Sequence, residues 1–275
     1  MSEPTSQTQT QPDPQIAAIC EDLEAETAEL LKLIVGLSPI HWDMNTPAEG
    51  WSVRDAVSHL AFFDETGTLA ATDAEAFTAS AKDLMASTDQ GVGGITRGRS
   101  MKPVEVLNWF ISARSNMIAN FRNLDAKSRL PWYGPSMGAL SFATARLMET
   151  WAHGQDIADA LGATRPATAR LRHIAHIGVR ARPYSYVINN REVPPVDVAV
   201  RLNAPDGSTW TWNDDAADQN LIRGDALEFC LIVTQRRHLL DTSLEVTGDA
   251  ATEWVGFAQA FAGGAGSGRK PLPNT

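Results

Sequence analysis

The stretch ALSFATARLMETWAHGQDIADALG, residues 139–162, decides the fold, because it predicts one long helix against which other helices must pack. Gly162 can take the left-handed conformation that ends a helix, and Pro166 lies where a helix could not continue. Apolar residues cover most of the circumference, so the helix is expected to be largely buried. These residues are Leu140, Phe142, Leu147, Met148, Trp151, Ile157 and Leu161.

A polar stripe runs along this apolar helix. Arg146, Glu149, His153 and Asp156 follow one another at steps of three, four and three, which places them on one face. A carboxylate and an imidazole one turn apart can bind the same divalent ion, and burying such groups without a partner costs roughly several kcal/mol. The stripe therefore predicts a counterpart elsewhere in the chain. The ordinary alternative is a solvated or salt-bridged pair of Glu and His.

A second stretch, GWSVRDAVSHLA over residues 50–61, supplies the candidate counterpart. Ser52 followed by Asp55 has the form of a capping box, which predicts a helix that begins at Val53. His59 lies two turns into this helix among apolar neighbours. It is a candidate metal ligand, and the alternative is a core histidine that is hydrogen-bonded to a backbone or side-chain acceptor.

Other helices are expected on both sides of these two. Apolar spacing predicts helices over residues 15–37 and 103–123, and a shorter one over 74–86. The segment DQGVGGITRGRS, residues 89–100, is expected to be a loop, because it lacks the lysine and hydroxyl placement of a nucleotide-binding loop and no strand precedes it. A further helix after Pro166 carries His173 and His176, but no carboxylate or cysteine stands at a useful spacing, so no second metal site is predicted there.

The spacing of apolar residues changes after Pro194, from a helical to an alternating pattern. Alternation in VDVAVRLNAP and TWTWN, joined by the turn residues PDGS, predicts a hairpin. A strand over 219–223, a helix over 225–236, a strand in SLEVTG and a closing helix over 250–261 follow. The chain is therefore predicted to be an α+β protein: a disordered tail over 1–14, a helical domain over 15–185, a small α/β domain over 186–262 and a flexible tail over 263–275.

The composition restricts the function classes. The 275 residues are 43% hydrophobic and 20% charged, with a net charge of −10 and a pI near 5.0. Scattered basic residues in an acidic chain argue against nucleic acid as a partner. No apolar run reaches membrane-spanning length and the N-terminus lacks the apolar segment of a secretory signal, so a soluble, cytoplasmic protein is expected. Cys20 and Cys230 fit buried thiols in a reducing compartment.

The two stretches together resemble a known family. GWSVRDAVSHLA followed about ninety positions later by ARLMETWAHGQDIADALG resembles the DinB-like superfamily, in its mycothiol-dependent maleylpyruvate isomerase branch. The resemblance implies an N-terminal four-helix bundle whose metal is held by His59, Glu149 and His153. It also implies a small C-terminal α/β domain, somewhat similar to sterol-carrier domains, from which an arginine reaches the active site. The stretch LEFCLIVTQRRH most resembles its location, so Arg236 is the first candidate and Arg237 the second.

The chemistry of this ligand set agrees with the resemblance. Two imidazoles and one carboxylate leave an open position for water or substrate, which is typical of catalytic zinc, although Ni, Co, Mn or Fe(II) would also suit. A thiol cofactor at such a site, mycothiol by the resemblance, would be held as a nucleophilic thiolate. Asp156 is expected either to orient His153 from outside the ligand set or to be a surface carboxylate.

These observations predict a divalent-metal-dependent enzyme of the thiol-dependent isomerase or transferase type that acts on a small molecule. It would activate a low-molecular-weight thiol or a substrate oxygen, while Arg236 would orient a substrate carboxylate or enolate. One alternative is a thiol-independent metal-assisted isomerase, cyclase or hydrolase that acts on a specialised metabolite. Another is a non-enzymatic metal-containing protein that binds an apolar ligand. The oligomeric state and the residues that bind the cofactor are not assigned by the sequence.

Overall fold

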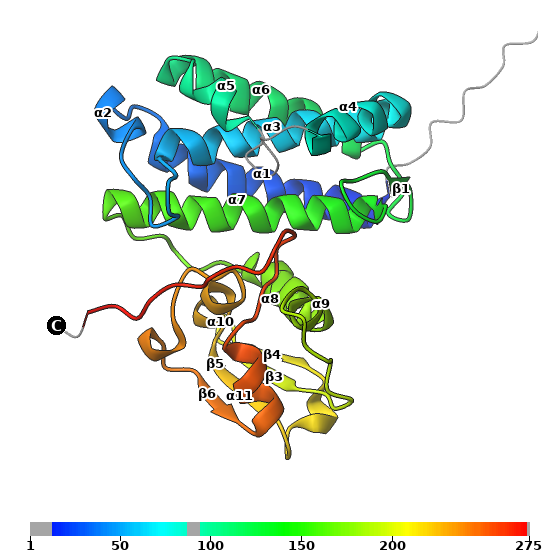
Figure 1. Ribbon diagram of the computed structural model, residues 1–275, viewed down its shortest axis with the longest axis vertical. Coiled ribbons are helices and arrows are strands. Elements are labelled where there is room, and N and C mark those ends of the chain that lie inside the picture. Colours follow the sequence, from blue (N-terminus) through cyan, green and yellow to red (C-terminus); the bar gives the residue numbers. More distant parts are fainter. Residues whose placement is uncertain (1–12, 87–93, 274–275) are drawn as a thin grey trace, which may run out of the picture.

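Four long helices form one half of the molecule, and a small sheet covered by shorter helices forms the other (Figure 1). The computed structural model describes residues 13–86 and 94–273. The predicted α+β fold, a helical bundle followed by a small unit with a sheet, is thereby confirmed. The predicted disordered tail over 1–14 lies outside the described residues except for its last two, where Asp13 caps the first helix.

The bundle consists of α1 (Pro14–Ile34), α3 (Val53–Thr72), α6 (Pro103–Phe121) and α7 (Ala139–Leu161). The helix α3 packs along α6, and α1 packs along α7. The helix α3 begins at its predicted residue, and the ends of the other three differ from their predictions by at most three residues. The largest difference is in α1, which ends at Ile34, before extended Val35 and before Gly36 at φ +82°. The helix α4 (Ala74–Ala86) has its predicted bounds. Shorter elements complete this half: α2 (Pro39–Trp42), α5 (Ile95–Arg99), β1 (Arg129–Leu130) and β2 (Met137–Gly138).

The segment predicted as a loop over 89–100 contains one short helix. Of its residues, 89–93 lie outside the described part of the chain, but α5 occupies Ile95–Arg99 and packs on α3. The backbone of α5 at Gly98 packs directly on the side chain of Ser58 in α3. A side chain at this position would not fit, because a Cβ atom there would lie 1.8 Å from Ser58 Oγ. A helix of five residues held by a glycine has too few apolar positions to show periodicity, and this is why the prediction missed it.

The predicted capping box at the start of α3 is present. Ser52 Oγ accepts from the backbone N–H of Asp55 at 3.2 Å, and an Asp55 oxygen accepts from the backbone N–H of Ser52 at 2.9 Å. Arg99 of α5 donates to both oxygens of Asp55, each at 2.9 Å. The side chain of Asp55 is buried. It therefore fixes the first turn of the helix that carries His59 one turn later.

Asp55→Asn is expected to lower the free energy of unfolding by about 1 kcal/mol at pH 7. Burial opposes ionisation of Asp55, but the hydrogen bonds from Arg99 and Ser52 hold its pKa below the ordinary value. A depressed folded-state pKa contributes stability above the unfolded value of about 3.9 and loses it as the pH falls through the folded value. Chemical unfolding at a series of pH values should therefore show a difference between variant and wild type that is constant from about pH 7 to 5 and shrinks below. A difference that does not vary with pH would contradict this role.

A buried ionic cluster lies inside the bundle. Asp64 of α3 accepts from Arg114 of α6 at 2.7 Å and from Arg146 of α7 at 3.1 Å, and all three side chains are at most 4% exposed. Arg114 also donates to the hydroxyls of Thr27 and Thr150. The cluster thus joins all four long helices. Arg146, the first residue of the predicted stripe, belongs to this cluster.

The C-terminal unit is built on a four-stranded sheet in the order β4-β3-β5-β6. β3 (Ala199–Asn203) and β4 (Thr209–Trp212) form the predicted hairpin, while β5 (Leu221–Asp225) runs parallel to β3 and antiparallel to β6 (Glu245–Thr247). The helices α10 (Ala226–Val233) and α11 (Asp249–Val255) follow, with 3-10 turns η1 (Asp214–Ala216) and η2 (Leu239–Asp241). Both helices are shorter than predicted, because Gln235 adopts a left-handed conformation after α10 and Gly256 caps α11.

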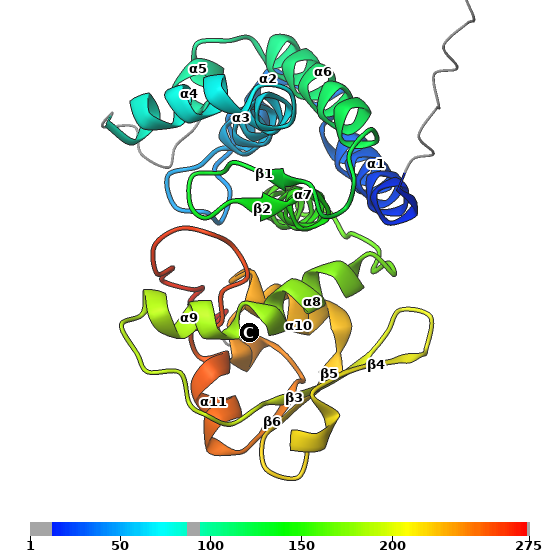
Figure 2. The same cartoon turned by 90° about the vertical axis from the view of Figure 1, so that its right-hand side faces the viewer.

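The helices α8 (Leu171–Arg180) and α9 (Arg182–Ile188) pack with the C-terminal unit, whereas the sequence assigned most of this segment to the helical domain. In both views α8 and α10 lie between α7 and the sheet (Figure 2). The contact between them is close: a Cβ atom at Gly178 would meet Val233 at 2.7 Å. The apolar face of α8 could be read from the sequence, but the identity of its partner could not.

Residues 263–273 form neither helix nor strand, yet they follow a defined path. The sequence predicted a flexible tail, but hydrogen bonds to Tyr184, Gln235, Gln259 and Asp241 hold this segment on the C-terminal unit. Composition could not reveal these bonds because their partners are remote in sequence. The segment then passes between the two halves of the molecule (Figure 1).

Both cysteines are buried free thiols, as predicted. Burial raises the pKa of Cys20 to about 11 and the pKa of Cys230 well above its ordinary value. Neither thiol is therefore an activated nucleophile. Within the described residues, no helix has the length and apolarity that a membrane span requires.

Candidate metal centre

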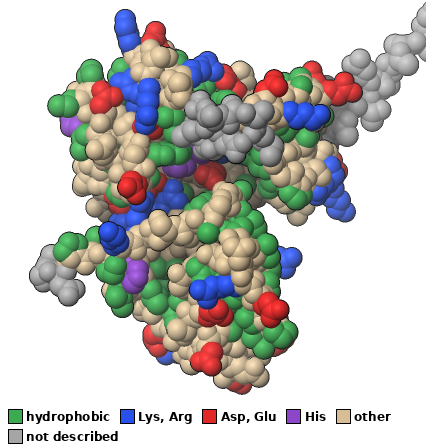
Figure 3. All heavy atoms as spheres, in the orientation of Figure 1, with side chains coloured by type: hydrophobic (Ala, Val, Ile, Leu, Met, Phe, Trp, Pro, Cys, Tyr) green, Lys and Arg blue, Asp and Glu red, His purple; other side chains and the backbone are tan. Residues whose placement is uncertain are grey.

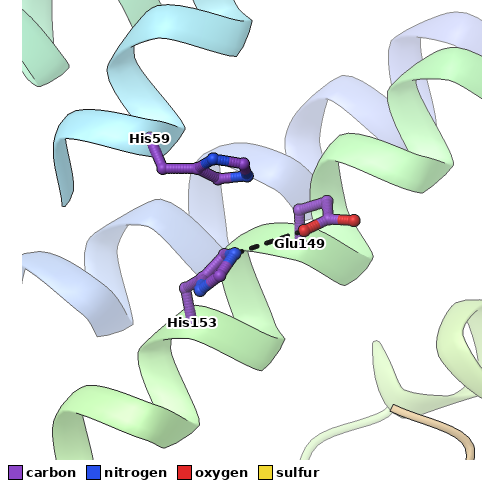
Figure 4. A group of neighbouring side chains, drawn as sticks. All are labelled: His59, Glu149 and His153. Atoms are coloured by element: carbon purple, nitrogen blue, oxygen red, sulfur yellow. Dashed lines mark ion pairs between the residues drawn. The ribbon is translucent and has the colours of Figure 1, made fainter. Parts of the chain in front are cut away.

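The three predicted ligands meet at one point (Figure 4). His59 projects from α3, and Glu149 and His153 project from α7 toward it. One ligand atom from each lies within 4.8 Å of the other two. His153 Nε2 is 3.4 Å from Glu149 Oε2, close to the edge of about 3.3 Å expected for a tetrahedron with metal–ligand distances near 2.0–2.1 Å. The two stretches singled out in the sequence therefore form one cluster.

Local packing fixes these side chains. Helical spacing of four residues stacks Glu149 and His153 on one face of α7. The ring of Trp51 lies parallel to the His153 ring at 5.4 Å between centroids, and the ring of Phe63 lies 4.6 Å from that of His59. Aromatic rings thus shield both imidazoles from water on one side.

The charge states of His59 and Glu149 suit metal binding, whereas a metal at His153 would have to displace a proton that the nearby carboxylates favour. Burial, followed by the neighbouring His153, lowers the pKa of His59 well below 6.5, so this imidazole is neutral with a free lone pair. Burial opposes ionisation of Glu149, but His153 and His59 outweigh it and lower the pKa of the carboxyl to about 2. Burial lowers the pKa of His153, but the carboxylates of Asp156 and Glu149 outweigh burial, so the pKa lies above its ordinary value. A carboxylate between two imidazoles is thus ready for a cation.

The donor set fits a divalent ion. His59 Nδ1 is buried without a hydrogen-bond partner among the described residues, which is costly for a polar atom unless something else binds the ring. Imidazole and carboxylate are ligands that zinc and several other divalent metals share. Among the described residues, no other group of three His, Cys, Asp or Glu comes together in this way.

Asp156 lies directly outside this cluster. It is fully buried, and its Oδ2 is 3.5 Å from His153 Nδ1, which is long for a hydrogen bond and makes the contact mainly electrostatic. Arg236 donates to Oδ2 at 2.8 Å, and Arg269 donates to Oδ1 at 2.7 Å. Burial opposes ionisation, but Arg236 and His153 hold the pKa of Asp156 well below its ordinary range. Asp156 is therefore a charged residue behind His153 and not a surface carboxylate.

The two arginines predicted as active-site candidates take different places. Arg236 reaches Asp156, and Arg237 binds both oxygens of Asp159, one turn further along α7, at 2.6 and 2.9 Å. Of the two, Arg236 is therefore nearer to the candidate ligands. Figure 3 shows Lys and Arg side chains gathered where the two units meet. Sequence reasoning missed Arg269, because it stands in a stretch with no periodicity, 113 positions from its partner.

The two histidines of the second pair, His173 and His176, do not share a partner in the structure. His173 Nε2 lies 2.8 Å from Asp22, and His176 Nδ1 accepts from Trp212 at 3.2 Å, so the two rings have separate partners.

Known proteins resemble this chain over most of its length. A family model described as the mycothiol maleylpyruvate isomerase N-terminal domain matches residues 23–158. An uncharacterized protein of Mycobacterium tuberculosis, present in two strains, is 41% identical over 252 residues, which cover 90% of this chain and 96% of that protein. Crystal structures of the mycothiol-dependent maleylpyruvate isomerase and of a mutant of it share 13% identity with the chain, with TM-scores of 0.56 and 0.54. Each match covers 80% of this chain and 89% of the matched chain. At 13% identity the similarity shows a shared fold.

Proposed function

Since the chain belongs to the mycothiol maleylpyruvate isomerase family of DinB-like proteins, we propose that it is a divalent-metal-dependent enzyme of the thiol-dependent isomerase or transferase type. One observation carries the proposal: His59, Glu149 and His153 bring two imidazoles and a carboxylate within 4.8 Å of one another. Three protein ligands leave an open position, the pattern of a catalytic rather than a structural zinc site. The substrate is a small molecule, and zinc is the first candidate for the metal.

A divalent ion in this cluster would supply Lewis acidity that lowers the pKa of a bound thiol or water, and a low-molecular-weight thiol such as mycothiol would supply the nucleophile. The protein itself provides the remaining features. Burial keeps His59 neutral, Glu149 stays ionised, and Asp156 orients His153 from behind. The guanidinium of Arg236 provides a fixed positive charge that can orient a substrate carboxylate or enolate.

Substitution with cobalt tests the thiol part of this proposal, because the visible absorption of Co(II) reports its coordination. Titration of the cobalt protein with a low-molecular-weight thiol should change the absorption bands and add the charge-transfer band of a sulfur ligand. The same titration with an alcohol of similar size is the control. A cobalt spectrum that responds to pH but not to thiol would favour the thiol-independent hydrolase or isomerase. A protein that binds no cobalt at all would contradict the metal centre.

Arg236→Ala is expected to lower turnover of an electron-poor unsaturated acid, in the presence of thiol, by about 10²–10³-fold, the typical loss when one preorganised charge-stabilising donor is removed. Arg237→Ala is the matched control, because Arg237 also links the C-terminal unit to a carboxylate of α7. Kinetics should be measured beside metal content and melting temperature. If both variants keep their activity and lose only stability, Arg236 is a structural residue and the active site belongs to the bundle alone.

A further inference from the structure

The last residues of the described chain, 263–273, form a strap that is fixed on the C-terminal unit. The hydroxyl of Tyr184 accepts from the Gly263 N–H at 3.0 Å, and Gln259 accepts from the Gly266 N–H at 2.9 Å. Further along, Asp241 accepts from the Leu272 N–H at 3.0 Å. Gly266 passes so close to Gln235 that a Cβ atom there would lie 2.0 Å from its Oε1. The strap therefore has one defined course.

From this strap, Arg269 reaches the bundle. Its Nη2 donates to Asp156 Oδ1 at 2.7 Å, and its Nη1 donates to the carbonyl of Pro47. These are the contacts with the bundle that the structure records for polar groups of residues 263–273. The side chain is only 23% exposed although its segment lies on the surface. Arg269 is thus directed into the junction between the two units.

The first contact bears on His153 through Asp156. Arg236 holds Oδ2 of Asp156, and Arg269 holds Oδ1. A carboxylate held at one oxygen can still rotate about its terminal torsion, which is a broad and soft one. Donors at both oxygens fix its plane. The oxygen that faces His153 Nδ1 at 3.5 Å is therefore fixed by two arginines, one of which belongs to the strap.

The second contact bears on the same histidine by another route. Pro47 belongs to the turn between α2 and α3, and four residues later this turn carries Trp51. The Trp51 ring is stacked on the His153 ring with an angle of 3° between their planes. Arg269 thus touches the carboxylate behind His153 and the turn whose aromatic ring covers it.

We propose that Arg269 is a positioning residue of the metal centre, and that the strap of residues 263–273 is part of the site. Arg269 acts on His153 through Asp156 and through the turn of Pro47. Its effect on metal affinity rests on the proposed function, whereas its effect on the His153 ring does not, because that ring can be observed in metal-free protein.

Three variants test the proposal in the full-length chain: Arg269→Ala, Gly266→Val, which displaces the strap but keeps the arginine, and Lys270→Ala. The last is the control, because it removes a neighbouring cation that is exposed and for which no polar contact is found among the described residues. The ring signals of His153, followed by NMR in metal-free protein, should shift in Arg269→Ala and in Gly266→Val but not in Lys270→Ala. Zinc affinity, measured by chelator competition, should fall about tenfold in the first two, the lower end of what loss of an outer partner causes.

Two outcomes would overturn the proposal. One is an Arg269→Ala protein with unchanged His153 signals and unchanged zinc affinity. The other is a loss of equal size in Lys270→Ala, which would make the effect one of general charge. Combining Arg269→Ala with Asp156→Asn should add little beyond Asp156→Asn alone, and full additivity would exclude the route through Asp156. Wild-type protein that binds neither zinc nor cobalt would contradict the proposed function, while the NMR comparison would still decide the role of Arg269.

Discussion

His153→Ala is expected to lose the bound metal and, with it, turnover. His153 is the candidate ligand that contacts both Glu149 and Asp156, so under the proposed function its removal deletes a metal–ligand bond and leaves two carboxylates facing an empty space. Loss of an outer partner alone costs about 10–100-fold in metal affinity or activity, so loss of a ligand should cost ~100-fold or more. Elemental analysis after dialysis, together with turnover in the presence of thiol, measures both effects.

His173→Ala provides the matched control. It also removes a histidine whose ring lies beside an aspartate, but at a position on α8 away from the candidate ligands. This variant should keep its metal and its activity. Full metal occupancy in His153→Ala would contradict the assignment of the centre. Metal loss of equal size in both variants would show that the metal responds to general destabilisation.

Asp64→Ala is expected to lower the free energy of unfolding by about 3–5 kcal/mol, the usual cost of removing one partner from a buried ionic cluster. Its carboxylate is the counter-charge that the structure records for both Arg114 and Arg146, which are 3% and 4% exposed. Burial already lowers the pKa of Arg114, in spite of the nearby Asp64. Without that carboxylate, two buried cations would face each other. Urea unfolding at neutral pH, followed by circular dichroism, measures the change.

Glu24→Ala is the control for Asp64→Ala. It also removes a carboxylate that accepts from an arginine, but Glu24 and Arg122 are 46% and 42% exposed, so water screens the pair and the cost should stay below about 1 kcal/mol. Equal losses in the two variants would contradict the argument from burial. If Asp64→Ala fails to fold, Asp64→Asn retains the shape and isolates the loss of charge.

The parts of the fold that could be predicted are those with local signals. The ligand spacing on α7 and the capping box before His59 each involve residues within one or two turns, so the helix period alone places them on one face. Predicting that the candidate ligands meet then required only the inference that these two helices face each other. Family resemblance supplied that pairing.

The parts that could not be predicted depend on contacts between remote positions. Asp64 and Arg114 are charged residues in helices, and the helical pattern gives no sign that they are buried against each other 50 positions apart. From the sequence alone, Arg146 could equally have pointed toward the candidate metal ligands, because it lies on the same face of the helix as Glu149 and His153. Arg269 stands among glycines and a serine, a composition typical of mobile segments, and only the fold shows that Asp156 holds it.

The ion pairs between three arginines of the C-terminal unit and two aspartates of α7 bear on whether the bundle can be separated from that unit. Asp156 and Asp159 lie on a bundle helix, but the arginines that neutralise them come from the C-terminal unit, at Arg236, Arg237 and Arg269. A bundle expressed alone would lose these three arginines, so Asp156 and Asp159 would carry their charges without the partners that they have in the whole chain. This turn of α7 is therefore electrostatically complete only when both units are present. Any replacement C-terminal unit must bring its own cations to the same turn of the helix, and a chimera designed on helix packing alone would lack them.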